Sequence, residues 1–168
     1  VAPLPSNPLP VALDLDNALR ARLTMAGGAM GGAMDAYIGQ HPMTAMMGHG
    51  NGIPDASGRL GIRDLAGHGF AWSLSGIAGM PAEPVITAKR GETVVITMPN
   101  ETAWPHAMHV HGHHFRKTSG GPWRDTILIE RGATAQVAFV ADNPGDWMIH
   151  CHMLEHQAAG MGTWFRVV

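Results

Sequence analysis

The chain has 168 residues, a net charge of −2 and a single cysteine. Its length fits one domain, which would bury roughly 70% of the surface of the unfolded chain. The charge balance and the lack of a basic run argue against nucleic acid as a partner, and no apolar stretch reaches the ~20 residues that span a bilayer. The first residues show no charged start followed by an apolar run, so we expect no signal peptide within the chain. One cysteine excludes an internal disulfide.

The first 24 residues are predicted to be an extended connector that ends in a strand. Prolines at positions 3, 5, 8 and 10 stiffen its start, as in an interdomain linker. The run 19–23, Leu-Arg-Ala-Arg-Leu, is expected to form the first strand.

Residues 25–52 are rich in methionine and glycine and are predicted to be a flexible insert. Soft thioethers select Cu(I), so we expect this segment to capture cuprous ions. The candidate ligands are Met25, Met30, Met34, Met43, Met46 and Met47. The alternative is a disordered insert, or a helix that uses methionine as filler. Met30 and Met34 have the spacing of one helical face, but each glycine weakens a helix by roughly 1 kcal/mol relative to alanine.

Residues 53–168 are predicted to form the core of a β-sandwich. Short β-type runs recur between turn signals, at 84–88, 93–98, 126–129 and 135–140. Their even spacing and the scarcity of helical periods favour an all-β, antiparallel sandwich of Greek-key type. The run 152–159 is expected to form a short helical turn, and the whole chain, 1–168, is expected to be a single domain.

Eight of the eleven histidines lie in two blocks between positions 106 and 156. The first block, 106–114, reads His-Ala-Met-His-Val-His-Gly-His-His. Successive side chains of a strand point to opposite faces. His109 and His111 would therefore share one face of this strand, and His106 would lie on the other.

The second block, 150–156, reads His-Cys-His-Met-Leu-Glu-His, and a methionine follows five residues later. In a strand, Cys151 would point to one face while His150 and His152 point to the opposite face. The two blocks together give one face the two imidazoles, thiolate and thioether of a blue-copper centre: His106, Cys151, His156 and Met161. The opposite face would carry a second metal site: His109, His111, His150 and His152.

Other interpretations explain fewer of these residues. Independent burial of single histidines in the core does not account for their clustering. A zinc hydrolase motif of the HxHxDH kind would need an aspartate where His113 stands, and it leaves Cys151, His156 and Met161 without a role. A catalytic cysteine is weaker still, because a thiolate bound to a metal is not available as a nucleophile.

The two blocks resemble those of the C-terminal cupredoxin domain of multicopper oxidases, the laccase-like enzymes. The likeness extends to 19–23, 70–76 and 123–126. It implies a cupredoxin β-sandwich in which the type 1 copper is held by His106, Cys151, His156 and Met161. It further implies that the type 2 copper is held by His109 and the type 3 pair by His111, His150 and His152.

The resemblance also implies an activity. Single electrons from a substrate, Cu(I) or a small phenol, would reach the type 1 copper and pass through Cys151 and its neighbours His150 and His152. They would arrive at a trinuclear copper cluster that reduces O2 to water. The location implied is periplasmic or secreted.

Within the family, the Met-rich segment points to the bacterial copper-efflux, or cuprous oxidase, branch. The chain departs from that branch at two places. The run 102–105, Thr-Ala-Trp-Pro, stands where those relatives often have an aspartate and a methionine, and Gln157 stands where they have an acid used in proton delivery. Glutamine cannot exchange a proton at ordinary pH, so Glu155 is the nearest carboxylate left for that task.

The chain contains one HxHG block and one HCH block. By the resemblance this encodes a complete type 1 site and half of the trinuclear site. We therefore expect an incomplete fragment, whose partners are the N-terminal cupredoxin domains of the same parent oxidase. A standalone blue-copper electron carrier and a Met-rich copper-buffering module remain as alternatives.

Overall fold

The computed structural model describes residues 3, 9, 12–28, 35–44 and 60–168. Two short helices lie in this part of the chain, α2 (Ile62–Gly67) and α3 (Leu154–Ala158). The strands are β1 (Leu19–Arg22), β2 (Met25–Gly27), β3 (Asp35–Ile38), β4 (Leu60–Gly61), β5 (Trp72–Leu74), β6 (Ile77–Ala78), β7 (Thr87–Ala88), β8 (Thr93–Pro99), β9 (His106–Val110), β10 (Arg116–Lys117), β11 (Thr126–Ile129), β12 (Thr134–Val140), β13 (Gly145–Cys151) and β14 (Gly162–Val167). No helix in the described ranges is long and apolar enough to cross a membrane.

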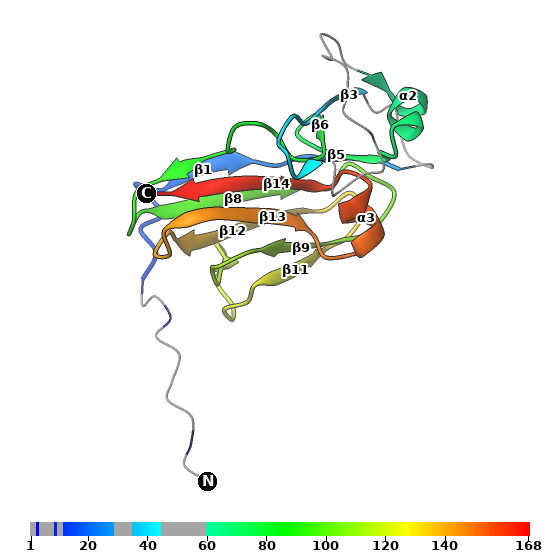
Figure 1. Cartoon of the computed structure of the whole chain (residues 1–168). Coiled ribbons are helices and arrows are strands. Elements are labelled where there is room, and N and C mark those ends of the chain that lie inside the picture. Colours follow the sequence, from blue (N-terminus) through cyan, green and yellow to red (C-terminus); the bar gives the residue numbers. More distant parts are fainter. Residues whose placement is uncertain (1–2, 4–8, 10–11, 29–34, 45–59) are drawn as a thin grey trace.

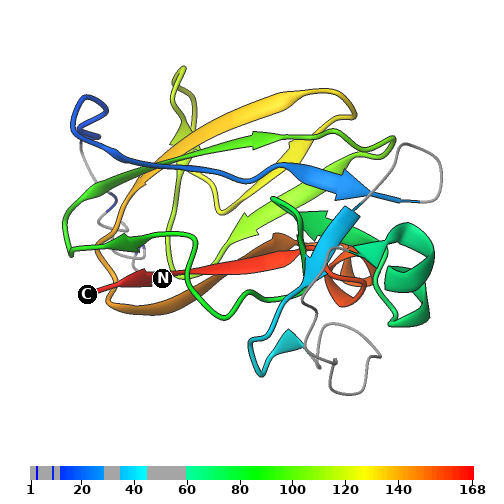
Figure 2. The ribbon, with the colours of Figure 1, turned by 90° about the horizontal axis from the view of Figure 1, so that it is seen from above.

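Two sheets form the body of the molecule, with the strand orders β1-β8-β12-β10 and β11-β9-β13-β14-β7. Figures 1 and 2 show their long strands, β8 and β12 in one sheet and β13 and β14 in the other, stacked as two layers. Pairs such as β8 with β12 and β9 with β13 join strands that are not consecutive in the chain. This confirms the predicted all-β, Greek-key cupredoxin sandwich.

The core lies between the two sheets and is built from the inward side chains of each strand. In β9, His106, Met108 and Val110 are buried while the two residues between them are half-buried. Phe139 of β12 and Phe165 of β14 are both fully buried, and their ring centroids lie 5.3 Å apart. Burial of such side chains stabilises the folded state by roughly 1.5–3 kcal/mol each.

A third, smaller sheet has the order β2-β5-β6-β3-β4. With α2 it lies over the end of the sandwich where β13 runs into α3 (Figure 1). It has a core of its own, formed by Ala36, Ile38, Leu65, Phe70 and Ala78. The described parts of the 25–52 segment therefore include regular strands, β2 and β3, because their backbones pair with β5 and β6. Gly48, Gly50 and Gly52 lie outside the described residues.

Most predicted strands appear, with shifted ends. The run 70–76, which the family resemblance implies to be a strand, is a strand only over β5, because Ser75 and Gly76 adopt positive φ angles of 50° and 79° and turn the chain into β6. The run 84–88 is a strand only over β7, which pairs in parallel with the end of β14. The helical turn expected within 152–159 is α3, and α2 was not anticipated.

Candidate metal centre

Three donor atoms converge where β9 and β13 lie side by side. The Cys151 Sγ lies 3.8 Å from the Nδ1 of His106 and 3.6 Å from the Nδ1 of His156. The two Nδ1 atoms are 3.1 Å apart. Nitrogen and sulfur ligands lie about 2.0–2.3 Å from a metal such as zinc, so ligands of one ion are separated by about 3–4 Å. The three residues thus fit a single ion, and we call them the inner cluster.

Backbone pairing explains how these residues meet. β9 and β13 are antiparallel and place Cys151 opposite Met108. Met108 is two residues from His106, so the two side chains lie on the same face of β9. The chain then enters α3, which returns His156 to the thiol. Met161 follows; its carbonyl accepts a hydrogen bond from the Cys151 N–H at 3.1 Å, and its side chain is fully buried in the same core.

Burial sets the protonation state of the inner cluster. Desolvation lowers the pKa of the fully buried His106 to about 4, and the neighbouring His156 adds to this effect. Burial also lowers the pKa of His156 and raises the pKa of the Cys151 thiol. Both imidazoles are therefore neutral at pH 7 and offer a lone pair, as a metal ligand must. The indole of Trp72 packs against both rings, at 5.0 Å and 4.6 Å between centroids.

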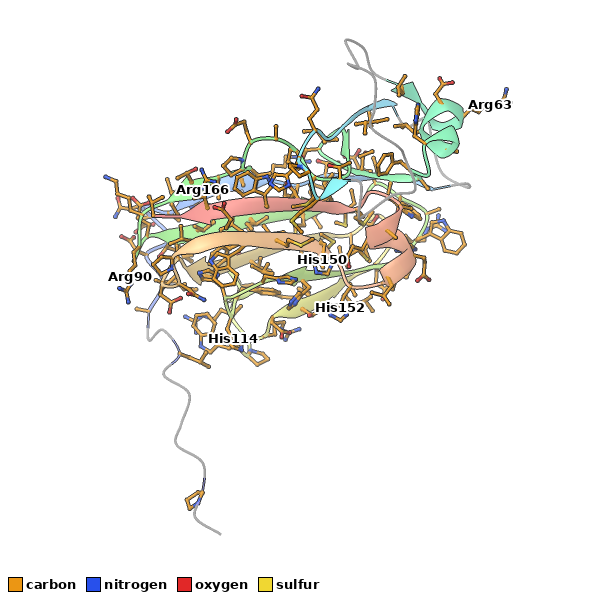
Figure 3. The ribbon with its side chains drawn as sticks, viewed as in Figure 1. Arg63, Arg90, His114, His150, His152 and Arg166 are labelled. Carbon is orange, nitrogen blue, oxygen red and sulfur yellow. The ribbon has the colours of Figure 1, made fainter. Side chains whose placement is uncertain are left out.

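A second group of imidazoles lies on the opposite face of β9 and β13. His109, His111 and His150 bring one ring nitrogen each within 4.8 Å of one another. The Nε2 atoms of His111 and His150 are 2.9 Å apart. The ring of the exposed His152 lies beside His109, with 5.2 Å between centroids. We call the four residues the outer cluster; Figure 3 shows His150 and His152 near the end of β13.

Hydrogen bonds orient two rings of the outer cluster. The Nδ1–H of His150 donates to the Cys151 carbonyl at 2.8 Å, and the Nδ1–H of His109 donates to the Asp125 carbonyl at 2.9 Å. In each ring the lone pair therefore lies on Nε2, where it is available to bind a metal. Burial lowers the pKa of His150 to about 4 and also lowers the pKa of His111.

The Met-rich candidates are only partly described. Met25 is fully buried in the main core on β2, so its thioether faces the interior of the sandwich. Met43 is half-buried and packs against the pair formed by Met80 and Trp164. Met30, Met34, Met46 and Met47 lie outside the described residues.

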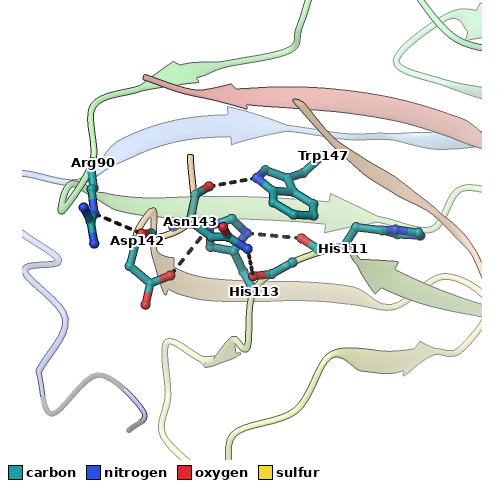
Figure 4. A network of polar contacts seen from close by, with 7 residues as sticks. Arg90, His111, His113, Asp142, Asn143 and Trp147 are labelled. Carbon is teal, nitrogen blue, oxygen red and sulfur yellow. Dashed lines mark hydrogen bonds and ion pairs between the residues drawn. The ribbon is translucent and has the colours of Figure 1, made fainter. Parts of the chain in front are cut away.

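Several residues around the clusters were not anticipated. Trp72 reaches His106 from β5, which belongs to another sheet, and Thr102 reaches it from the turn just before β9. The sequence marked the run 102–105 only as a departure from the copper-efflux relatives and linked neither residue to the ring of His106. His113, which the sequence left without a role, lies in a polar network (Figure 4). Its Nδ1–H donates to the His111 carbonyl at 3.1 Å, and its Nε2 accepts the Asn143 N–H at 3.4 Å. This network holds the turn that follows His111.

The family follows from comparison with known proteins. Residues 61–168 match the family model described as multicopper oxidase. The chain belongs to the multicopper oxidase family. It is 34% identical over 98 residues to the multicopper oxidase MmcO of Mycobacterium tuberculosis, a match that covers 56% of this chain and 19% of that protein. It is 37% identical over 109 residues to copper resistance protein A of Escherichia coli, covering 61% of this chain and 18% of that protein.

Solved structures extend the likeness of the fold to the whole chain. The multi-copper oxidase from Pseudomonas thermotolerans superposes with a TM-score of 0.64 at 24% identity, over 99% of this chain and 33% of that one. The chain thus spans about a fifth of the length of these curated relatives and a third of this solved structure. Family membership implies copper as the metal.

Proposed function

We propose that this chain is the C-terminal, electron-accepting type 1 copper domain of a multicopper oxidase. The observation that carries the proposal is the adjacency of His150 and Cys151, which belong to the outer and inner clusters respectively. A covalent path of one residue step therefore joins the two donor groups. A protein that only stores a metal has no need of that connection.

The inner cluster, together with Met161, would hold the type 1 copper. His109 would hold the type 2 copper, and the type 3 pair would be held by His111, His150 and His152. Bound copper would supply the one-electron redox chemistry by which O2 is reduced to water. Cys151 contributes the thiolate and, through its backbone, links the inner cluster to His150 and His152.

The two inner imidazoles differ in exposure, and this favours one route for electrons. His106 is fully buried and packs against Trp72, whereas His156 is half-buried and is partly accessible to solvent. A substrate that donates single electrons, such as Cu(I) or a small phenol, would therefore approach the ring edge of His156. Trp104 lies two residues before His106 and is 42% exposed, and it would shape the approach.

The outer cluster supports the proposed partner. His109 and His111 are half-buried and His152 is exposed, so a metal ion bound to their free nitrogens could also bind donors from another domain. The N-terminal cupredoxin domains of the same parent oxidase would supply those donors. A periplasmic or secreted location is part of this proposal.

Loading the protein with Cu(II) tests the inner cluster. We expect an intense visible band from thiolate-to-copper charge transfer, which His106→Ala removes. His114→Ala is the matched control, because His114 is exposed and belongs to neither cluster. Loss of the band in both variants, or in neither, would contradict the assignment.

Oxygen uptake by the intact parent protein tests the rest. We expect uptake with Cu(I) or with phenols, and we expect His109→Ala to abolish uptake while it keeps the visible band. An electron carrier would instead bind about one copper per chain, and His109→Ala would change neither its oxygen uptake nor its visible band. Several Cu(I) ions per chain with no visible band would indicate a copper buffer.

A further inference from the structure

We propose that Thr102 is a positioning residue for the type 1 site, whose hydroxyl fixes the ring of His106 with Nδ1 as the metal-binding atom. The inference rests on the proposed function and extends it to a residue outside the ligand set. Thr102 lies in the turn between β8 and β9 and is 5% exposed. Its Oγ1 is 2.8 Å from the Nε2 of His106, the ring nitrogen that faces away from Cys151.

The hydrogen atoms around the hydroxyl can be assigned by counting donors. A threonine hydroxyl donates once and accepts twice. The Thr102 proton has two oxygen acceptors within reach, the Oδ1 of Asn100 at 2.7 Å and the carbonyl of Trp104 at 3.0 Å, and the backbone N–H of Trp104 donates to Oγ1 at 3.1 Å. The lone pair that remains faces His106. With the hydroxyl proton on one of these oxygens, the proposed assignment puts the proton of His106 on Nε2, which donates to Oγ1, and leaves Nδ1 with its lone pair.

The orientation of Asn100 is itself determined by its surroundings. Asn100 is 2% exposed, and its amide nitrogen faces three backbone carbonyls, those of Trp104 at 2.6 Å and of Ile129 and Glu130 at 3.1 Å each. Only the amide NH2 can donate to carbonyls, so Oδ1 must point toward Thr102. The Thr102 N–H also donates to this Oδ1, at 3.0 Å. A chain of hydrogen bonds thus connects the end of β11 to Asn100, Asn100 to Thr102, and Thr102 to the ring of His106.

A hydrogen bond from the distal N–H of a ligating histidine fixes its tautomer and raises its basicity as a ligand. For His106 that partner is a side-chain hydroxyl held in a closed network. Loss of the hydroxyl leaves a buried N–H without an acceptor and frees the ring to adopt the other tautomer, which presents a proton to the metal.

Two variants and one control test this role. Thr102→Val removes the hydroxyl at nearly constant volume, and Thr102→Ser keeps it. Thr163→Val is the control, because Thr163 is also a buried threonine, and its Oγ1 has no hydrogen-bond partner among the described residues. We expect Thr102→Val to weaken Cu(II) binding by about 10–100-fold, to shift the thiolate-to-copper band and to raise the reduction potential. Thr102→Ser and Thr163→Val should retain the wild-type affinity, band and potential.

The outcomes separate the two proposals. If the wild type shows no thiolate-to-copper band, the proposed function fails. If the wild type shows the band and Thr102→Val keeps its affinity, position and potential, the role of Thr102 is overturned and the proposed function stands. Nitrogen-15 NMR of the metal-free wild type gives a reading that needs no folded variant. We expect His106 with its proton on Nε2, and a proton on Nδ1 would overturn the inference.

Discussion

The Nδ1 of His150 lies 2.8 Å from the carbonyl oxygen of Cys151, its neighbour in β13. This short hydrogen bond turns the Nε2 of His150 toward the Nε2 of His111, 2.9 Å away, while the Cys151 side chain points to the opposite face. Two neighbouring residues thus belong to two donor clusters on opposite faces of β13, and the peptide bond between them connects the clusters. Four predictions follow from this arrangement and its supports.

Cys151→Ser is expected to remove the visible band of the Cu(II)-loaded protein, because the band requires a thiolate. The hydroxyl occupies nearly the same buried volume, so we expect the unfolding free energy to fall by only about 1–3 kcal/mol. Absorption spectra and urea unfolding measure the two effects. A Cys151→Ser protein that is still intensely blue would rule out Cys151 as the ligand.

Met161→Leu is expected to keep copper and to raise the reduction potential, since a weak axial thioether tunes a type 1 site. Met161 is fully buried, and an exchange of methionine for leucine conserves volume, at a cost usually below about 1.5 kcal/mol. A redox titration of both proteins measures the shift. An unchanged potential would mean that Met161 does not bind the copper. Met80→Leu serves as the control, because Met80 is a buried methionine that packs on Trp164 instead.

Gly112→Ala is expected to destabilise the turn after His111 more than Gly132→Ala does its own turn. Both glycines have a φ of 69°, but a Cβ on Gly112 would lie 2.5 Å from the Trp147 ring, whereas a Cβ on Gly132 would meet nothing within 4 Å. Gly132→Ala therefore measures backbone strain alone, about 1–2 kcal/mol.

Gly112→Ala adds the overlap with Trp147, typically a further ~1–3 kcal/mol. Urea unfolding of the two variants gives the difference. Because the strain moves His111 and not Cys151, we expect Gly112→Ala to impair only the outer cluster. Equal losses of stability in the two variants would show that the Trp147 side chain moves away from the added Cβ without a measurable cost in free energy.

The metal-free protein is expected to lose stability as the pH falls from about 6.5 to about 4. Burial lowers the folded-state pKa of both His106 and His150 to about 4, below the ordinary value of 6.5. The unfolded chain therefore binds more protons in this window, so the unfolding free energy rises with pH and levels off above 6.5. Each residue contributes up to roughly 3 kcal/mol.

Urea unfolding at several pH values measures this slope. His106→Asn removes one of the groups that titrate in this window, so its slope should be smaller by about one proton. His114→Asn, a change at an exposed histidine, should leave the slope as it is. A stability that does not vary across this window would mean that the two imidazoles do not stay neutral in the folded state.

The fold and the grouping of donors were accessible from local pattern. Alternation of side chains along a strand places His109 with His111 and Cys151 opposite to His150, and it needs no knowledge of the rest of the chain. The Gly-rich segment was less accessible, because β2 and β3 depend on pairing with β5 and β6, and methionine has no pattern that tells a core position from an exposed one. Met25 lies in the core for that reason.

The amino-acid sequence by itself determined the β-sandwich, the family resemblance and the two sets of donors, since each depends on residue type at short spacing. Only the tertiary structure decided which groups surround those donors. Thr102 reaches His106 through a turn ordered by β11, and Trp72 covers both inner rings from another sheet. Contacts of this kind depend on how distant segments pack, and packing in three dimensions leaves no periodic trace along the chain.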